Sequence, residues 1–370
     1  MLLLNTLKNK LYPVISRYLA NATLVNGILK GADKPFRCLF VENSNMMDYV
    51  CTQAYASYPR ILKKWKAWIP DLHKTIINNS SSFDLCIAVL PKNIGSVLSR
   101  VCDFTGDEWV RQYIDTSGKF EEIKKHFHKT KIQVSNQVRH KYGMSYRVSN
   151  DLNDFELFYY RMYVPHTKIK FDNQAYIASY EVMKGYFKKG FLLLITTESQ
   201  DIAGALCVKN DDVLFFRDQG VLDGSEVYVK RGAQYAIYYF TIHYAWENGF
   251  KTLDTMKSRS CLNDGVYKTK RDWGATVYAD DESDASVYYM IPRFSETISA
   301  YFNNNPAIIN EEDGLYGLAG WQGAYDIAML DKNELSKRYF SPGLKGMILL
   351  SPTGGKMKMS FDEVSTQGLI

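Results

Sequence analysis

Two carboxylates near the ends of strand-like runs are the first candidates for acid–base chemistry in this sequence. Asp218 lies near the end of the apolar run Val213 to Gln219, and Asp254 lies in the short run Thr252 to Thr255. A carboxylate at a strand end beside a cleft is able to act as a general base or to anchor a substrate. A structural hydrogen-bonding role is an equal alternative for both residues.

Two arginines and a tyrosine add groups for binding and proton transfer. The guanidinium groups of Arg217 and Arg259 are suited to clamp an anionic donor or acceptor through paired hydrogen bonds. Tyr267 is a candidate to protonate a leaving thiolate or ribose oxygen. His243 is expected to be packed inside an aromatic helix, and Cys261 has no histidine near in sequence to activate its thiol.

The cysteines and histidines do not predict a metal site. None of the six cysteines forms a C-x-x-C pair or a metal-ligand spacing with the six histidines, and His126 with His128 is expected to be part of a solvated helix face. We therefore predict no metal and reduced thiols in a cytoplasmic protein. The cysteines are Cys38, Cys51, Cys86, Cys102, Cys207 and Cys261.

The elements expected to position these residues form a recognisable order. Three strand-like runs, separated by a polar segment and by the Asn210-Asp211 turn, predict an antiparallel meander. A long helix that ends at Gly249 and a short strand follow. The expected strands are Phe191 to Thr197, Ile202 to Lys209, Val213 to Gln219 and Thr252 to Thr255, and the helix is Val229 to Asn248.

Several short motifs in this region resemble the GNAT acyltransferase superfamily, and within it most closely the Fem-type peptidyltransferase and related acetyltransferase-like branch. They are Gly190-Phe-Leu-Leu-Leu, Ile202-Ala-Gly-Ala-Leu, Phe215-Phe-Arg-Asp and Tyr244-Ala-Trp-Glu-Asn-Gly-Phe-Lys-Thr-Leu-Asp254. The segment from Ser258 to Gly274 adds the branch's pattern of a glycine, a short helix and a lysine before an aromatic-Gly pair. The resemblance extends from about Ser135 to Val277.

The resemblance implies an α/β fold in which a mixed sheet is flanked by helices, with tandem GNAT-like halves. Two central strands then splay apart and bind the pantetheine arm of a CoA thioester, while the next helix start binds pyrophosphate. The matching loop departs from the family, because Gln234 replaces the middle glycine. The expected donor-binding residues are Lys230, Arg231, Gly232, Ala233 and Gln234.

The same resemblance implies roles for further residues. Lys270 stands at the family's lysine position and is the first choice for stabilising the negative charge that develops on the attacked carbonyl. Thr269 stands where relatives often carry an aromatic residue. With Asp218, Asp254 and Tyr267, Lys270 completes the expected catalytic set. The expected substrate-binding residues are Arg217, Gln219, Arg259, Asp264 and Trp273.

These expectations lead to one enzymatic prediction and two alternatives. The leading prediction is acyl transfer from acyl-CoA to an amine or hydroxyl of a small-molecule, sugar or lipid-linked acceptor, by direct attack without a covalent enzyme intermediate. Fem-type relatives use aminoacyl-tRNA, so peptidyl or aminoacyl transfer from charged tRNA is the first alternative. A non-catalytic GNAT-fold binding module is the second.

The rest of the chain predicts a weaker first half and an extension. Strands are expected at Cys38 to Val41, Asp84 to Leu90, Ser145 to Val148 and Val287 to Ile291, and helices at Met46 to Trp68, Phe120 to Tyr142, Asp151 to Tyr163, Asn173 to Lys188 and Arg293 to Asn303. We expect a helical segment over 1–35, a degenerate GNAT-like half over 36–140, the catalytic half over 141–292 and an extension over 293–370.

Length and charge limit the class of protein. A chain of 370 residues predicts two domains or a duplicated unit. The net charge of +5 is small and dispersed, which argues against a DNA-binding protein. Residues 1–20 carry leucines at helical spacing but lack an apolar span of ~20 residues. A cytoplasmic protein is expected, with peripheral contact of residues 1–20 at the inner membrane face as an alternative.

Overall fold

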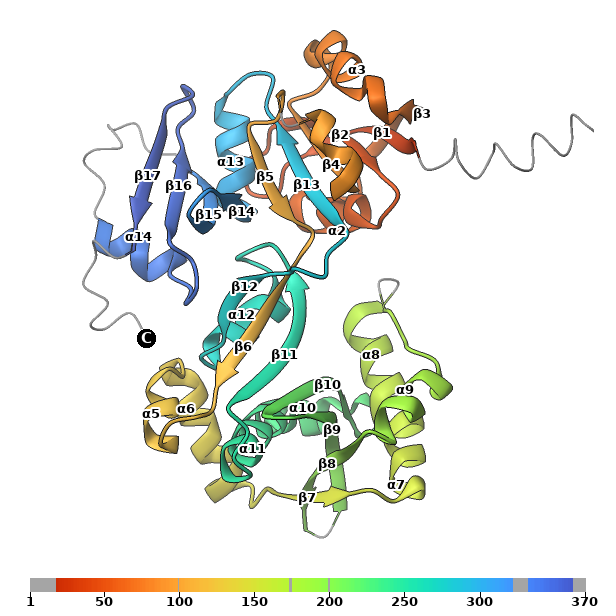
Figure 1. Cartoon of the computed structure of the whole chain (residues 1–370), viewed down its shortest axis with the longest axis vertical. Coiled ribbons are helices and arrows are strands. Elements are labelled where there is room, and N and C mark those ends of the chain that lie inside the picture. The colour runs from red at the N-terminus through yellow and green to blue at the C-terminus, as the bar shows by residue number, and fades with distance from the viewer. Residues whose placement is uncertain (1–17, 99, 173–174, 199, 322–331, 362–370) are drawn as a thin grey trace, which may run out of the picture. The chain divides into compact units, whose positions relative to one another are not determined.

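The chain folds into two compact units (Figure 1). The computed structural model describes residues 18–98, 100–172, 175–198, 200–321 and 332–361. Unit 1 comprises Met1–Val110, Ser258–Lys268 and Ala279–Leu369, and unit 2 comprises Arg111–Lys257, Thr269–Tyr278 and Ile370. Both units are assembled from segments that lie far apart in sequence, unlike the continuous ranges expected above.

Unit 2 is built on a seven-stranded mixed sheet with the order β12-β6-β11-β10-β9-β8-β7. The expected meander is confirmed, because β8, β9 and β10 pair antiparallel with one another. β11 then pairs parallel with β10. The strands are β6 (Trp109–Asp115), β7 (Ser145–Ser149), β8 (Gly190–Thr197), β9 (Gln200–Asn210), β10 (Val213–Val221), β11 (Thr252–Arg259) and β12 (Thr276–Ala279).

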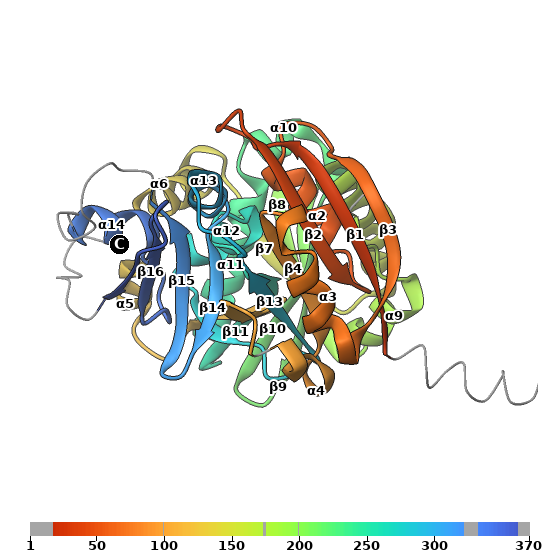
Figure 2. The same cartoon turned by 90° about the horizontal axis from the view of Figure 1, so that it is seen from above.

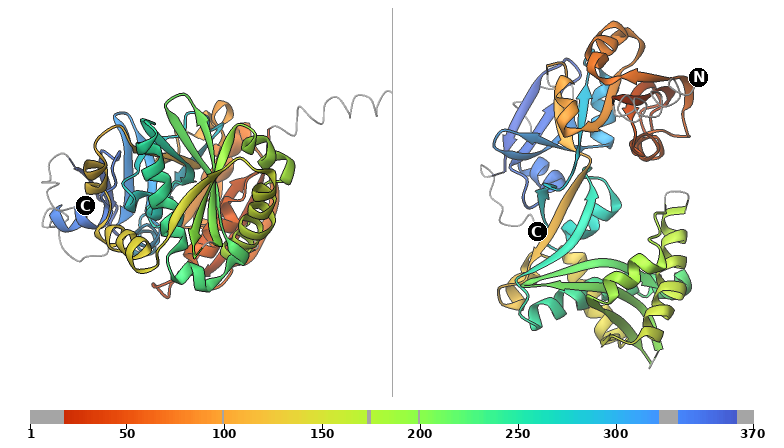
Figure 3. Two further views of the ribbon diagram at one scale, coloured as in Figure 1. Left: turned by 90° about the horizontal axis from the view of Figure 1, so that it is seen from below. Right: turned by 45° about the vertical axis from the view of Figure 1, so that its right-hand side comes forward.

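Helices cover both faces of this sheet, as Figure 3 (left) shows. The buried run Phe191 to Ile195 explains why, since alternate side chains of a strand point to opposite faces. The helices and helical turns are α5 (Phe120–Lys125), α6 (Lys129–Asn136), η4 (Gln137–Lys141), α7 (Leu152–Leu157), η5 (Phe158–Tyr163), α8 (Val164–Phe171), α9 (Tyr180–Phe187), η7 (Leu222–Gly224), α10 (Glu226–Lys230), α11 (Ala233–Glu247) and α12 (Gly265–Asp272).

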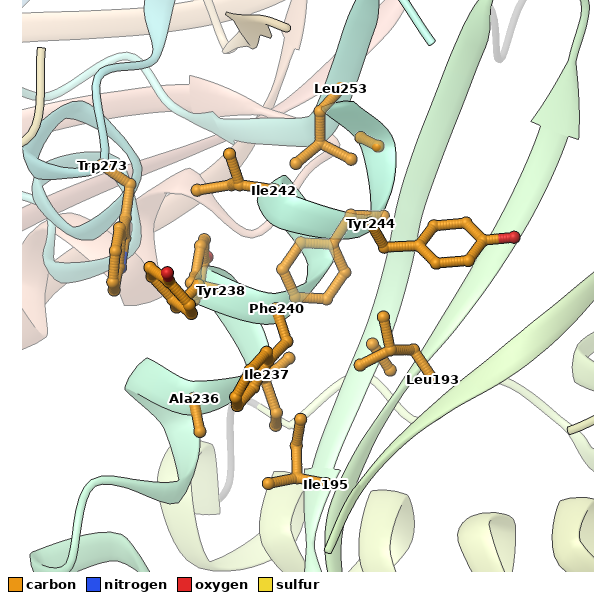
Figure 4. Close-up of a cluster of buried hydrophobic side chains, with 14 of the residues drawn as sticks. Leu193, Ile195, Ala236, Ile237, Tyr238, Phe240, Ile242, Tyr244, Leu253 and Trp273 are labelled. Carbon is orange, nitrogen blue, oxygen red and sulfur yellow. The ribbon is translucent and has the colours of Figure 1, made fainter. Parts of the chain in front are cut away.

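The main core of unit 2 lies between α11 and one face of the sheet. Leu193 and Ile195 point into it from β8, and Tyr238, Ile242 and other residues of α11 fill it (Figure 4). The opposite face of β8 carries Leu192 and Leu194, which pack against η5 and α9. α11 is therefore a buried helix, which agrees with its run of apolar and aromatic residues.

Unit 1 contains a six-stranded mixed sheet with the order β3-β1-β2-β4-β13-β5 (Figure 2). β13 follows the segments of unit 2 in the sequence. It nevertheless belongs to this sheet, where it pairs antiparallel with β4 and β5. The strands are β1 (Leu19–Ile28), β2 (Pro35–Glu42), β3 (Arg60–Trp68), β4 (Leu85–Pro91), β5 (Phe104–Asp107) and β13 (Ala285–Met290).

A third, four-stranded sheet with the order β14-β15-β16-β17 completes unit 1. Its strands are β14 (Ala307–Glu311), β15 (Gly314–Gly320), β16 (Gly346–Leu350) and β17 (Lys356–Ser360). The helices and turns of unit 1 are α2 (Met46–Ala54), η1 (Ile69–Asp71), α3 (Leu72–Asn78), η2 (Ser80–Ser82), α4 (Lys92–Gly95), η3 (Ser96–Leu98), α13 (Glu296–Asn304) and α14 (Lys332–Tyr339).

The fold class is confirmed, since the described residues form mixed sheets flanked by helices. Helix over Met46 to Trp68 is wrong beyond Ala54, because Arg60–Trp68 forms β3. β3 is an edge strand that pairs with β1, and its exposed lysines are typical of an edge that must not pair with another chain.

Three expected helices have different bounds. The helix expected from Asn173 begins at Tyr180, because the Ser179 side chain accepts the Val182 amide and caps it. The helix over Phe120 to Tyr142 is divided, since α6 starts after its N-cap His128. The helix expected from Val229 is interrupted at Gly232, whose φ of 92° lies in the left-handed region. The helical segment expected over 1–35 is wrong for Leu19–Ile28, which forms β1, while residues 1–17 lie outside the described part.

Candidate active site in unit 2

The feature that sets unit 2 apart is the separation of two parallel neighbours, β10 and β11. Their register runs over three pairs, from Val213↔Thr252 to Phe215↔Asp254, whereas β10 continues to Val221 and β11 to Arg259. Figure 3 (right) shows β11 turning away from β10. The two strands therefore form a wedge that opens toward their carboxyl ends, which we call the β10–β11 wedge.

An extra residue in β10 marks the point where the wedge opens. Phe216 is opposite Cys207 and Asp218 is opposite Leu206, so that Arg217 is a bulged residue without a partner position on β9. A β-bulge bends a strand and redirects its side chains, and bulges are frequent beside active sites. Arg217, Asp218 and Gln219 are thereby presented together, all partly buried.

On the other side of the wedge, β11 is kinked at Met256. Met256 has φ 65°, in the left-handed region that a methionine rarely adopts. Its amide donates a 2.6 Å hydrogen bond to Oδ1 of Asp254. The Lys270 ammonium, 4% exposed, donates to the carbonyl oxygens of Met256 and Lys257 at 3.0 and 2.9 Å. The two side chains named as catalytic candidates on this side both bind the β11 backbone.

Asp218 is the carboxylate best suited to accept a proton. Burial raises its pKa to about 6, and the positive charge of Arg217 opposes that shift. Burial raises the pKa of Tyr163 to about 12, and the Asp218 charge adds to this shift. A carboxylate with this pKa is ionised at neutral pH and is a stronger base than an exposed aspartate.

Asp254 has a different electrostatic environment. Its side chain is 0% exposed, and Oδ2 pairs with Nη1 of Arg111 at 3.5 Å. Burial raises its pKa, while the Met256 amide and the charges of Arg111, Lys270 and Arg217 oppose that shift. Asp254 is thus surrounded by cations, and its carboxylate is already engaged.

Arg217 and Gln219 hold unused hydrogen-bonding capacity. In the part of the chain that the structure describes, neither the buried Nε of Arg217 nor the buried Oε1 of Gln219 has a hydrogen-bond partner. The Arg217 guanidinium stacks on the ring of Tyr186, with its central carbon 3.9 Å from the ring centroid. Because a buried polar group without a partner is costly, these atoms are suited to bind a ligand that supplies an acceptor and a donor.

The corresponding parallel pair of unit 1 is closed. β2 and β4 pair over five positions, from Cys38↔Leu85 to Glu42↔Val89, the last residue of β2 included. The Glu42 carboxylate then accepts the amides of Met46 and Met47 at 2.8 and 2.9 Å. It occupies the start of α2 and satisfies the free amides there. The parallel strands β10 and β11 of unit 2 therefore part, whereas the parallel strands β2 and β4 of unit 1 do not.

The expected donor loop surrounds the start of α11. Lys230 is exposed and pairs with Glu226 at 2.8 Å, and Arg231 is also exposed. Gly232 provides the left-handed N-cap of α11, and Ala233 is buried. The Gln234 amide nitrogen lies 2.7 Å from Nε2 of His166. Gln234 thus closes against α8 at the position where the family carries a glycine.

His166 is neutral in this arrangement. Burial lowers the pKa of its imidazole to about 4, and the charge of Lys170 adds to the shift. A neutral Nε2 is able to accept the hydrogen bond that the Gln234 amide donates. His166 is 6% exposed, so the contact ties α8 to the first turn of α11 inside unit 2.

Three expected site residues belong to unit 1. The guanidinium of Arg259 pairs with Glu108 at 2.6 Å and with Asn45, stacks on Trp109, and lines a cavity of about 40 Å³. Oδ1 of Asp264 accepts the amides of Val266 and Tyr267 at 2.9 Å, which caps α12. The Tyr267 hydroxyl lies 2.6 Å from Oγ of Ser341. All three are engaged in local structure there.

Trp273 is a core residue of unit 2. Its side chain is 0% exposed, stacks on Tyr238 with an interplanar angle of 2°, and meets the Phe127 ring edge to face. A side chain enclosed by α11 and by Phe127 has no surface to offer a substrate. The aromatic-Gly pair therefore contributes packing, and Gly274 adopts a left-handed φ of 81° close to His126.

Several residues of the wedge were missed by the sequence analysis. Arg111 lies on β6, far from Asp254 in sequence, and His166 lies between two expected helices of the predicted catalytic half, in a segment to which no role was given. The kink at Met256 has no sequence signal, because methionine is not typical of left-handed backbone. Across the described residues, no group of three or more His, Cys, Asp or Glu side chains is placed to hold a metal ion.

Comparisons with known proteins give structural neighbours only. No protein-family model matches the chain, and no curated protein matches its sequence. The solved structure of FemX is similar with 10% identity and a TM-score of 0.37, over 74% of this chain and 85% of that one. L-PGS from Bacillus licheniformis is similar with 8% identity and a TM-score of 0.34, over 72% and 83%.

A third neighbour is a GCN5-related N-acetyltransferase from Anabaena variabilis, with 11% identity and a TM-score of 0.27, over 90% of this chain and 74% of that one. A Fem protein and a GCN5-related acetyltransferase are the kinds of protein that the sequence motifs resemble. Because these TM-scores lie below 0.5, a site or an activity has to be argued from the geometry of the chain itself.

Proposed function

We propose that this chain is an acyltransferase of the GNAT type, with its reactive centre in the β10–β11 wedge of unit 2. The observation that carries the proposal is the parting of β10 and β11 after three pairs, with Arg217, Asp218 and Gln219 at the opening. A parted parallel pair offers backbone groups to an extended donor arm, and the bulge presents side chains beside that arm.

The proposed reaction is a direct attack of an acceptor amine or hydroxyl on the carbonyl carbon of the donor. Asp218 accepts the proton of the nucleophile as the new bond forms, and its raised pKa, about 6, suits that task near neutral pH. The bond from the carbonyl carbon to the sulfur of CoA, or to the ribose oxygen of tRNA, then breaks, and the proton held by Asp218 passes to this leaving group. No residue forms a covalent intermediate, because the wedge holds both substrates next to each other.

We assign the stabilisation of the carbonyl oxygen to Arg217. Its buried Nε, which pairs with nothing among the described residues, is able to donate to the negative charge that develops in the transition state. Stacking on Tyr186 keeps the guanidinium in one orientation. Lys270, the residue that the resemblance favours for this role, remains an alternative whose ammonium also binds two backbone carbonyls.

For the donor, acyl-CoA is the first proposal and aminoacyl-tRNA the second. The amides at the start of α11, with Lys230 and Arg231 beside them, suit the phosphates of either donor. One observation favours the second. Gln234 and its bond to His166 fill the position where GNAT enzymes carry a glycine that leaves room for pyrophosphate. The acceptor classes remain small molecules, sugars and lipid-linked molecules.

The proposed location follows from the sequence of residues 1–20 and from the described helices. The structure contains, in its described portion, no helix with the length and apolar character needed to cross a bilayer. A cytoplasmic location and peripheral membrane contact through residues 1–20 stay predictions. A liposome sedimentation assay with and without residues 1–17 tests the contact.

The proposed function is tested by transfer assays with purified protein. Labelled acetyl-CoA and labelled aminoacyl-tRNA are incubated separately with a pool of amines and hydroxyl compounds, and transfer of label is measured for the natural chain and for Asp218→Asn. We expect transfer from one donor and its loss in the variant. Transfer from neither donor, together with no binding of CoA or tRNA by calorimetry, would favour the non-catalytic module instead.

A further inference from the structure

Lys270 and Asp254 bind the same short stretch of β11, and the geometry of that stretch is unusual. Consecutive carbonyl groups of a regular strand point to opposite sides. The Lys270 ammonium nevertheless donates hydrogen bonds to the carbonyl oxygens of both Met256 and Lys257, at 3.0 and 2.9 Å. This is feasible because Met256 has φ 65°, which turns two successive carbonyls toward one side.

Asp254 acts on the same kink from the other side. Its Oδ1 accepts the Met256 amide at 2.6 Å, so both the amide and the carbonyl of Met256 are held by buried side chains. The Asp254 carboxylate is itself held by Arg111 at 3.5 Å. Asp254 is also the last residue of β11 that pairs with β10, so the kink begins where the ladder stops.

A left-handed methionine is unfavourable, and persists only where its surroundings hold it. The surroundings here are one buried cation and one buried anion, at 4% and 0% exposure. Their partners are backbone groups that an adjacent strand would otherwise bind. In unit 1, β2 and β4 pair to the end of β2, which shows the arrangement of a parallel pair without such a kink.

We infer that Lys270 and Asp254 are positioning residues that clamp β11 in its kinked course and so keep the β10–β11 wedge open for the donor. Neither is a catalytic residue in this scheme, because both hold the β11 backbone at Met256 and Asp254 is held in turn by Arg111. The part of this inference that concerns the donor rests on the proposed function. The clamp, by which we mean the hydrogen bonds of Lys270 and Asp254 to β11, does not depend on that function.

Loss of the clamp has a defined structural consequence. β10 carries its own bulge at Arg217, which leaves its edge out of register with a straightened β11. Released from Lys270 and Asp254, residues 256–259 therefore have no ladder to join on the β10 side, and the amides on that edge lose protection, while β6 still pairs with the other edge of β11. This consequence is independent of any ligand.

The first experiment measures amide hydrogen exchange of the full-length chain over the segment 252–259. Lys270→Met is expected to speed exchange there tenfold or more, while Lys270→Arg, which keeps donors for both carbonyls, restores protection to within about threefold. Lys268→Met is the matched control, because it makes the same change on α12 at an exposed position. Asp254→Asn, which keeps an acceptor for the Met256 amide, is expected to disturb exchange less than Asp254→Ala.

Unchanged exchange in Lys270→Met overturns the inference. Should Lys270→Met fail to fold, Lys270→Gln, which retains one donor group, takes its place, and the same comparison with Lys270→Arg decides. Protection in Lys270→Gln equal to that of the natural chain also overturns it.

The second experiment separates positioning from catalysis. Binding of CoA and of deacylated tRNA is measured by calorimetry, and kcat and KM are measured with the active donor. We expect Lys270→Met to weaken donor binding tenfold or more and to raise the donor KM, with recovery in Lys270→Arg. A loss confined to kcat, with normal donor binding, would show Lys270 to be the catalytic group instead. Absence of donor binding and transfer in the natural chain, with the expected exchange pattern, would refute the proposed function and leave the clamp intact.

Discussion

Asp218 combines a cost to stability with a proposed use in catalysis. Burial raises the pKa of its carboxyl to about 6, above the ~3.9 expected in the unfolded chain. The folded state therefore binds more protons between these two values, and this group's contribution to stability falls as the pH rises through that window. Above pH 6 the ionised buried carboxylate destabilises the fold.

Replacing Asp218 tests both effects at once. We expect Asp218→Asn to lower kcat about 10²- to 10⁴-fold, and to raise the free energy of unfolding at pH 7.5 by about 1–3 kcal/mol. At pH 4 the stability difference should vanish. Urea denaturation at the two pH values measures this, and the natural enzyme's kcat/KM should rise with pH through about 6. A variant that is less stable at pH 7.5 would contradict the assignment of a strained carboxylate.

Arg217 is predicted to act on the transition state. We expect Arg217→Met to lower kcat about 10²- to 10³-fold with a smaller change in KM, since one donor to the developing oxyanion is lost. Tyr186→Leu is the comparison variant: it leaves the guanidinium but removes its stacking surface, and should cost less than Arg217→Met. A rise in KM with an equal fall in kcat/KM, and with kcat unchanged, would identify Arg217 as a binding residue only.

At the scale of elements, close packing of η5 on β10 fixes one side of the wedge. A Cβ placed on Gly220 would lie 2.3 Å from the backbone carbon of Met162, in η5. Because backbone cannot move aside as a flexible side chain does, we expect Gly220→Ala to destabilise unit 2 by about 1–3 kcal/mol or more.

Gly185 provides the matched control for Gly220. It lies in α9 with nothing within 4 Å of an added Cβ, so Gly185→Ala should stabilise the helix by about 0.5–1 kcal/mol. Denaturant unfolding of both variants checks the pair. Equal stability of the two would mean that β10 and η5 are not packed as described.

The order of elements in unit 2 could be predicted because each strand carries a local apolar run bounded by turn residues. The meander β8-β9-β10, helix α11 and strand β11 are confirmed, whereas the break at Gly232, the strands β6 and β12 and the division of the helix over Phe120 to Tyr142 were not predicted. The strand β3 was assigned to a helix, because its hydrogen bonds come from β1, which lies far away in sequence. Local pattern is weakest for edge strands of this kind.

The sequence predicted which residue types form the candidate site better than it predicted how those residues are arranged. Arg217, Asp218 and Gln219 were identified from one short segment, and a bulge keeps such neighbours together. The roles of Lys270 and Asp254 depend on a kink at Met256 and on β6, neither of which has a sequence signal. Trp273, Tyr267, Asp264 and Arg259 were placed by motif, and the contacts of these side chains follow only from long-range packing.

At the scale of the whole molecule, strands are exchanged between the segments expected to be domains. β6 precedes residue 141 and yet lies between β11 and β12 in the sheet of unit 2, whereas β13 lies between β4 and β5 in unit 1. A fragment of residues 141–292 therefore lacks an internal strand of one sheet and carries an orphan strand of the other. Its unpaired edges favour aggregation.

Two fragments test this organisation. We expect residues 109–278, which contain every strand of the unit 2 sheet apart from Ala279 at the end of β12, to unfold cooperatively in urea, monitored by the fluorescence of Trp109, Trp246 and Trp273. Residues 141–292, which lack β6, should be insoluble or show no cooperative transition. Cooperative unfolding of 141–292 at the same midpoint as 109–278 would contradict the described strand order.

The position of β13 sets an order of events on the ribosome. The nascent chain has supplied all of unit 2 apart from Ile370 once Tyr278 emerges, whereas β4 and β5, made much earlier, still wait for Ala285–Met290 to be translated. Vectorial synthesis usually favours the N-terminal domain. Here the later-encoded half is complete first, and the edge of β4 that β13 covers stays unpaired until that strand has been made.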